Sequence, residues 1–177
     1  MKKLLVVLLV LAVMSGCKKE EIDIDAARAE QYASYIKAIQ DNETFMTAAD
    51  SQNYDIQLVM NQVDENVYRY DVILDNPRVA MYDIQMIAIE KDVLGTLRDD
   101  QIMPSVGILE EDKYSMIPNQ VDMNKNVPMG LDISGTTDQK TVYLQVMVVW
   151  TGYARLSQNR DFFTLQATFV GDTNDTK

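Results

Sequence analysis

The segment 141–151 restricts the fold of this sequence more than any other. Its even-numbered positions from 142 to 150 are apolar, namely Val142, Leu144, Val146, Val148 and Trp150. An alternation of this kind places every second side chain on one face of a β-strand. The opposite face is also partly apolar, since it carries Tyr143, Met147 and Val149. Such a strand is expected at the centre of a sheet that is covered on both sides.

The same alternation predicts further strands along the chain. We expect them in the ranges 54–61, 68–74, 79–90, 127–133 and 163–169, with two shorter ones near 106–109 and 113–117. The apolar phase shifts within 79–90, which indicates a β-bulge or a strand that changes sheets. Ser134 to Thr137 read as a turn and Arg155 to Asp161 as a polar loop. Six or seven strands without interleaved helices predict an antiparallel β-sandwich of immunoglobulin-like type.

One amphipathic helix is expected before the strands. Apolar residues recur there at spacings of three and four, and they are Ala29, Tyr32, Ala33, Ile36 and Ile39, with Tyr35 at the border of the stripe. A helix of this length needs a surface to pack on. The predicted organisation is therefore an N-terminal helical segment over 25–50, a β-sandwich over 51–171 and a polar tail over 172–177.

The first seventeen residues have the pattern of an export signal. Lys2 and Lys3 precede an apolar run from Leu4 to Met14, which is followed by Ser15, Gly16 and Cys17. A basic start, a short apolar run and small residues at its end are typical of a secretory signal peptide. The run is shorter than the roughly 20 residues that cross a bilayer.

Met14-Ser15-Gly16-Cys17 resembles the lipobox of bacterial lipoproteins, with Met14 in place of the commoner leucine. The resemblance implies cleavage between Gly16 and Cys17, removal of residues 1–16, and a diacylglycerol thioether on Cys17, usually with a third acyl chain on its amine. Residues 17–24 then form the lipidated cysteine and a short tether. The protein is expected on the extracytoplasmic face of the cell membrane, at the cell surface or in the periplasm, held by its lipid.

The charge of the chain excludes nucleic acid as a main partner. The net charge is −11, and removing residues 1–16 takes away two of the 16 basic residues and none of the 27 acidic ones, which leaves −13. A domain of this charge repels nucleic acid and anionic lipid surfaces. The acidity keeps a tethered domain soluble, and it also suits a cation or a basic partner.

Most common catalytic arrangements are excluded by composition. The chain has no histidine, and its single cysteine is the one expected to carry lipid. These facts remove Ser-His-Asp and Cys-His catalysis and the usual zinc sites. Ser34 and Lys37 match a Ser-x-x-Lys pattern, but the companion motifs are absent. We predict no catalytic residue, no metal site and no cofactor besides the lipid.

The remaining candidates are weaker. Calcium binding at Asp122–Asn124 or Asp172–Asp175 lacks the EF-hand spacing. The methionines, among them Met60, Met81, Met86, Met129 and Met147, read as core residues rather than a copper site. Of the tyrosines, Tyr143 and Tyr153 are expected at the surface.

The sequence favours a non-enzymatic, membrane-anchored lipoprotein that binds another protein or assists an envelope complex. That step rests on fold-level analogy. The alternative is a lipoprotein that binds a small ligand or a cation, and the third possibility is a hydrolase that works by carboxylates alone.

Overall fold

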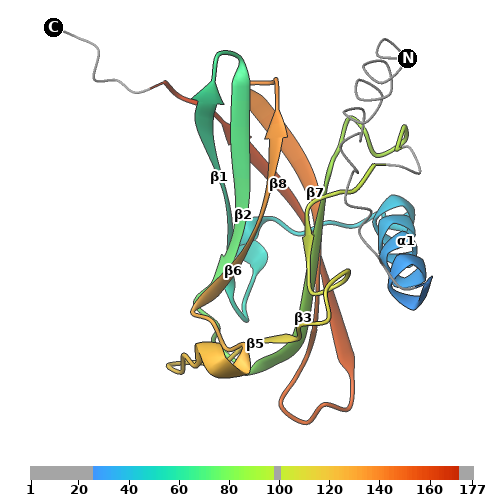
Figure 1. The fold of residues 1–177 in the computed structure, drawn as a ribbon, viewed down its shortest axis with the longest axis vertical. Helices are drawn as coiled ribbons and strands as arrows, with labels where there is room; N and C mark the ends of the chain where they lie inside the picture. Colours follow the sequence, from blue (N-terminus) through green and yellow to red (C-terminus); the bar gives the residue numbers. More distant parts are fainter. Residues whose placement is uncertain (1–25, 98–100, 172–177) are drawn as a thin grey trace, which may run out of the picture.

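The computed structural model describes residues 26–97 and 101–171 of the 177-residue chain. Within these ranges the helix α1 (Ala26–Asp41) precedes all the strands (Figure 1). The strands are β1 (Asp55–Asp64), β2 (Val67–Asp75), β3 (Met81–Glu90), β4 (Ser105–Val106), β5 (Tyr114–Met116), β6 (Gly130–Thr137), β7 (Thr141–Thr151) and β8 (Gln158–Thr168). Two short 3-10 helices, η1 (Ala48–Asp50) and η2 (Met123–Lys125), lie in the connections.

The strands form two sheets, and all of their pairings are antiparallel. One sheet has the order β1-β2-β6, and the other has the order β4-β3-β7-β8, with β5 pairing to β3. Both sheets are built largely from long hairpins, as the turn signals between alternating segments predict. The expectation of a mainly β chain with antiparallel sheets after one helix is confirmed.

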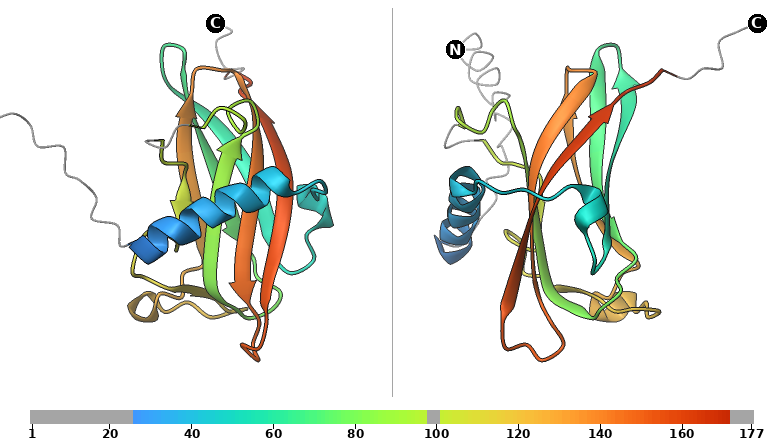
Figure 2. Two further views of the ribbon diagram at one scale, coloured as in Figure 1. Left: turned by 90° about the vertical axis from the view of Figure 1, so that its right-hand side faces the viewer. Right: turned by 180° about the vertical axis from the view of Figure 1, so that it is seen from behind.

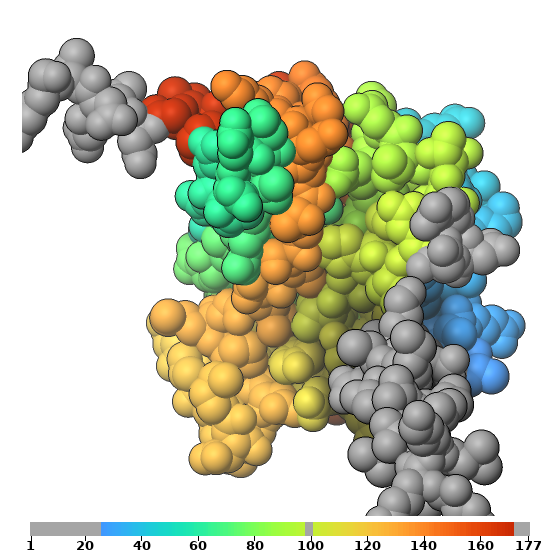
Figure 3. All heavy atoms as spheres, turned by 45° about the horizontal axis from the view of Figure 1, so that its top comes forward, coloured from blue at the N-terminus to red at the C-terminus, as the bar shows by residue number. Residues whose placement is uncertain are grey.

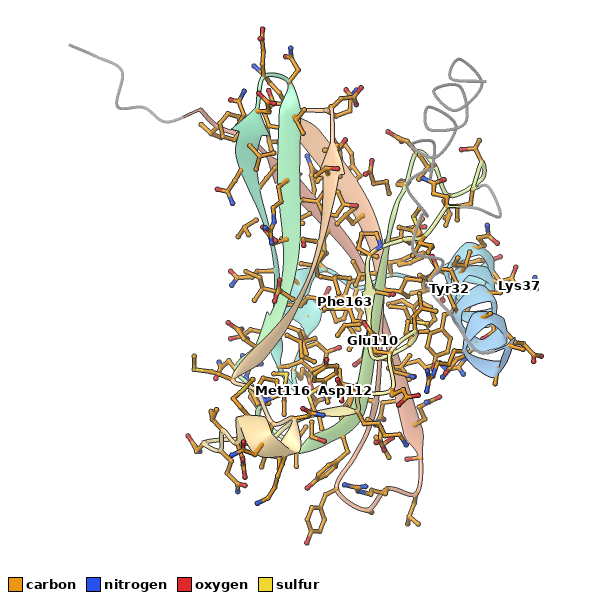
Figure 4. All side chains as sticks on the ribbon, viewed as in Figure 1. Tyr32, Lys37, Glu110, Asp112, Met116 and Phe163 are labelled. Carbon is orange, nitrogen blue, oxygen red and sulfur yellow. The ribbon has the colours of Figure 1, made fainter. Side chains whose placement is uncertain are left out.

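The inner faces of the two sheets share one apolar core. It includes Ile56, Tyr70, Val72 and Leu74 from the three-stranded sheet and Met86, Ala88, Leu144, Val146 and Phe163 from the other. Figure 4 shows Phe163 between the sheets. Each large side chain buried here contributes about 1.5–3 kcal/mol relative to exposure.

The helix covers the outer face of the larger sheet. α1 crosses the strands β3, β7 and β8 (Figure 2), and a second buried cluster joins Tyr35 and Ile39 to Ile87, Met147 and Val149. β7 is therefore central and covered on both faces, as its two apolar faces predict.

The buried side of α1 agrees with the predicted stripe in part. Ile39 is buried, and Tyr32 and Ile36 pack against the buried cluster. Ala29 and Ala33 are exposed instead, and Tyr35 is buried. Tyr35, expected at the border, is central because its hydroxyl has a partner below the helix: it donates to Gln85 Oε1 at 2.5 Å. An alanine has too little side chain to decide which face a helix buries.

The predicted irregularity of the third long strand is confirmed. The pairing of β3 shifts between Tyr82 and Gln85, and Asp83 lies between them with a φ of +50°. Gln85 follows this bulge and donates from Nε2 to the carbonyl of Gly107 at 2.9 Å. The bulge thus lets one side chain connect the strand to both α1 and the segment after β4.

Two predicted connections are in fact strand. Ser134 to Thr137, expected as a turn, belong to β6, and Gln158 to Asp161, expected as loop, begin β8. Their polar composition misled the prediction. Backbone pairing with β2 and β7 holds them extended, and partners from distant parts of the chain complete them, as described below.

The predicted signal segment, the lipidated cysteine with its tether and the polar tail lie outside the described residues. Nowhere in the described ranges is a helix both long enough and apolar enough to cross a membrane.

Candidate functional site

A groove of about 790 Å³ lies at the end of the molecule that holds β5 and η2. We call it the proline groove, because Pro77, Pro118 and Pro128 line it together with Ile73, Ile117, Val121 and Met129. The lining comes from the end of β2, the β2–β3 loop, the segment after β5 and the residues that lead into β6. In Figure 3 the segment 117–129, in gold, stands out from the lower part of the molecule.

The walls of the proline groove are held by turns whose residues suit them. Asn76 and Asn119 have φ values of +47° and +60°, and asparagine tolerates this region better than most residues. The segment around η2 is closed by two backbone hydrogen bonds between Asp122 and Val127, at 2.8 and 3.0 Å. A groove with such walls loses little conformational entropy when it binds.

Apolar side chains are exposed along the rim of this groove. Val121 is 60% exposed and Met129 is 76% exposed. The prediction that Met129 packs in the core is wrong, because β6 begins only at Gly130 and Met129 lies outside the sheet. Met81, Met86 and Met147 are buried as expected, and Met60 is partly buried.

Charges at this end are largely paired within the chain. Arg78 forms an ion pair with Asp55, which also accepts a hydrogen bond from Asn76 Nδ2 at 2.7 Å. These donors hold the pKa of Asp55 below its usual range. Lys125 pairs with Asp122 at 3.0 Å, and the hydrogen bond and charge of Lys125 lower the pKa of that carboxyl. The charged residues that line the groove are Asp75 and Arg78, and Arg78 is paired with Asp55.

A separate polar cluster serves the packing of the core. The hydroxyl of Tyr54 donates to Asp161 Oδ2 at 2.7 Å, and Trp150 Nε1 donates to the same oxygen at 2.9 Å. Burial, and after it the neighbouring Asp161 carboxylate, raises the pKa of Tyr54 far above the usual range. A tyrosine hydroxyl and an indole N–H each need a hydrogen-bond partner when they are buried. The Asp161 carboxylate thus satisfies both buried donors through one oxygen.

The structure describes only some of the candidate site residues that were named from the sequence. Gly16 and Cys17 lie outside the described residues. Ser34 Oγ donates to the Gln31 carbonyl at 2.7 Å, and Lys37 pairs with Asp41 at 2.7 Å on the exposed side of α1, which Figure 4 shows for Lys37. Ser34 and Lys37 are both exposed, and each makes a separate local contact on the surface of the helix.

The calcium candidates do not gain support. Asp122 caps η2 by accepting from the Asn124 amide at 3.2 Å and is paired with Lys125, while 172–175 are not described. In the described ranges no three acidic side chains converge as a metal site would require. Tyr143 and Tyr153 are exposed, as predicted.

Sequence reasoning missed the proline groove. The expected strands near 113–117 and over 127–133 divided the groove residues between two separate segments. The signal present in the sequence is the pair Pro118 and Pro128 with a mostly polar segment between them. Only the fold brings this segment beside the β2–β3 loop.

Comparisons with known proteins leave the chain without a family. No family model and no curated protein matches it. Among solved structures it is similar to one described as the X-ray structure of Northeast Structural Genomics Consortium target SoR45. The identity is 5% and the TM-score 0.40, over 71% of this chain and 93% of that one. A likeness of this size carries no statement about function.

Proposed function

We propose that this chain is a lipid-anchored lipoprotein on the extracytoplasmic face of the cell membrane, and that its domain binds another protein through the proline groove. The fold proposal that accompanies it is a β-sandwich of immunoglobulin-like type. The lipobox-like residues Met14 to Cys17 support the anchor. The exposed apolar rim of the groove, at Val121 and Met129, is the observation that carries the binding proposal.

The occupant we propose is an apolar side-chain anchor of a partner protein that has basic residues around it. Apolar surface that is concave and bordered by polar groups is typical of binding sites. The basic character follows from charge complementarity, because the chain has a net charge of −11 and Arg78 and Lys125 are already paired with carboxylates. Complementary charge favours fast and specific association.

Binding rather than catalysis is proposed for the domain. The chain has no histidine, and the carboxylate most enclosed by aromatic donors, Asp161, already accepts from both Tyr54 and Trp150. Its net charge disfavours nucleic acid as the partner.

The binding proposal is tested by site-specific photocrosslinking in intact cells that carry the native chain. A photoreactive amino acid is placed at Met129, and in a matched strain at Tyr143, which is exposed on β7 away from the groove. We expect one product of another protein from position 129, none of it from position 143, and its loss when Val121→Asp is added. Identical products from both positions, capture of the chain itself alone, or no product at all contradicts the proposal.

The anchor is tested separately. Growth with a fatty-acid analogue is expected to label the wild-type chain and to leave Cys17→Ser unlabelled and unprocessed. Label that persists in Cys17→Ser contradicts lipidation at this residue, whatever the crosslinking shows.

A further inference from the structure

A second cavity, of about 600 Å³, opens between β6 and the segments that follow β3. We call it the Glu90 cavity. Figure 3 shows its two sides, β6 in orange beside the yellow-green segments 90–97 and 101–110. Glu90 ends β3, whereas the proline groove lies near the β5 end, where Met81 begins the same strand. Ten residues of strand correspond to about 30 Å, so the two sites are separate.

The Glu90 cavity is built around a contact between the two sheets. The hydroxyl of Tyr70, on β2, lies close enough to the carboxylate of Glu90, on β3, that each group shifts the pKa of the other. The ring of Tyr70 crosses the backbone of β6 at Gly135, where an added Cβ would overlap the ring and its hydroxyl oxygen. Glycine at 135 is therefore what lets the tyrosine reach the acid.

The charge within this cavity has one sign. Glu90 and Glu110 both line it, and its described lining contains neither lysine nor arginine. Asp92 and Asp138 lie near enough to Glu90 to add to the negative field. Burial, more than these charges, raises the pKa of Glu90, while the neighbouring Tyr70 hydroxyl opposes the rise. A cation placed beside a partly buried carboxylate that has no cationic partner stabilises its charged form.

The remaining walls combine apolar and polar residues. Val93, Ile102, Met103, Pro104 and Leu109 are the apolar residues of the lining, and Gln101, Ser105, Ser134 and Thr136 are its uncharged polar residues. Mostly apolar walls with a few placed polar groups are characteristic of small-ligand sites. A ligand that matches both features has a hydrocarbon stem and a cationic head that donates hydrogen bonds.

We propose that the Glu90 cavity binds an alkylammonium or alkylguanidinium group, with Glu90 as its main acceptor and Glu110 as a second carboxylate in the same cavity. Such a group is found on free amines and on the lysine and arginine side chains of peptides. The proposal is independent of the proline groove, because it uses none of the groove's residues.

The test is calorimetric titration of the full chain in a neutral detergent at about 0.15 M salt, where long-range attraction is screened. The free-amine probe is 1,5-diaminopentane, and the peptide probe is Gly-Lys-Gly with both ends blocked. Pentane-1,5-diol is the neutral control. We expect saturable binding of at least one cationic probe and none of the diol. Which probe binds distinguishes a free amine from a peptide side chain.

Three variants decide the role of the cavity. Glu90→Gln keeps the shape and is expected to weaken binding by about 10- to 100-fold, the usual effect of losing one charge-assisted hydrogen bond. Glu65→Gln, in the exposed β1–β2 turn, removes the same charge elsewhere and should change binding less than twofold. Gly135→Ala displaces Tyr70 and is expected to weaken binding as well, with circular dichroism to check that the sheets persist. Equal binding by the wild type and Glu90→Gln, or no saturable binding of either probe, overturns the proposal.

Discussion

Trp150 on β7 and Asp161 on β8 are joined by a hydrogen bond of 2.9 Å from the indole Nε1 to Oδ2 of the carboxylate. The same oxygen accepts from Tyr54, which directly precedes β1 in the other sheet. One carboxylate oxygen thereby links the edge of the larger sheet to the smaller one. The contact connects residues 107 positions apart in the chain.

Asp161→Ala is expected to reduce the free energy of unfolding by about 2–4 kcal/mol, because it leaves two enclosed donors without an acceptor. Asp161→Asn should cost less, since its amide oxygen remains an acceptor. Urea unfolding measures the stability of both variants. It is followed by circular dichroism and not by fluorescence, because the substitutions change the hydrogen-bond partner of Trp150 and therefore its fluorescence. Asp132→Ala, an exposed acid on β6, is the control and is expected within about 0.5 kcal/mol of wild type. An Asp161→Ala variant as stable as this control would contradict the structural role.

Gly107→Ala is expected to destabilise the chain by about 1–3 kcal/mol. Gly107 has a φ of +71°, and an added Cβ would overlap the carbonyl oxygen of Ile84 beside the bulge of β3. The comparison variant is Gly95→Ala, where no atom lies within 4 Å of the added Cβ. Thermal unfolding of the two variants should show a lower Tm for Gly107→Ala alone. A similar Tm for both would mean that the position tolerates a side chain.

Ile39→Ala is expected to cost about 2–5 kcal/mol, because Ile39 is fully buried between α1 and the outer face of the larger sheet. Ala33→Ser, on the exposed side of the same helix, should be close to neutral. Guanidinium unfolding that reports similar stability for both variants would show that the helix is not docked as described.

Glu90→Gln is expected to be more stable than the wild type near neutral pH. Burial raises the folded-state pKa of Glu90 above 4.5, so the ionised carboxylate opposes folding at pH values above the folded pKa. As the pH falls through that pKa toward 4.5, the carboxyl is protonated and the opposition disappears. The groups that face Glu90 are Tyr70, Asp92 and Asp138, and none of them is changed.

The measurement is the difference in unfolding free energy between Glu90→Gln and the wild type from pH 8 to pH 4. We expect the advantage of the variant to shrink steadily on acidification. A difference that stays constant, or that grows as the pH falls, would show that Glu90 is not a buried acid of raised pKa.

Periodicity was sufficient to predict the kind of fold. The double-faced apolar pattern of 141–151 correctly indicated a central strand, and the phase shift in 79–90 correctly indicated a bulge. Both properties are local, because a strand's two faces alternate with the sequence itself. The Tyr35 face of α1 was not predicted, since its partner Gln85 is 50 residues away.

Local composition determined the mainly β class, the helix before the strands and the exposure of Tyr143 and Tyr153. Only the tertiary structure decided that 134–137 and 158–161 are strand. Gly135 is extended opposite Tyr70, whose ring occupies the space of a missing side chain, and Asp161 faces inward because Tyr54 and Trp150 donate to it. Polar and glycine residues signal a turn when read alone. Distant partners that satisfy their hydrogen bonds and fill their space make the same residues part of a sheet.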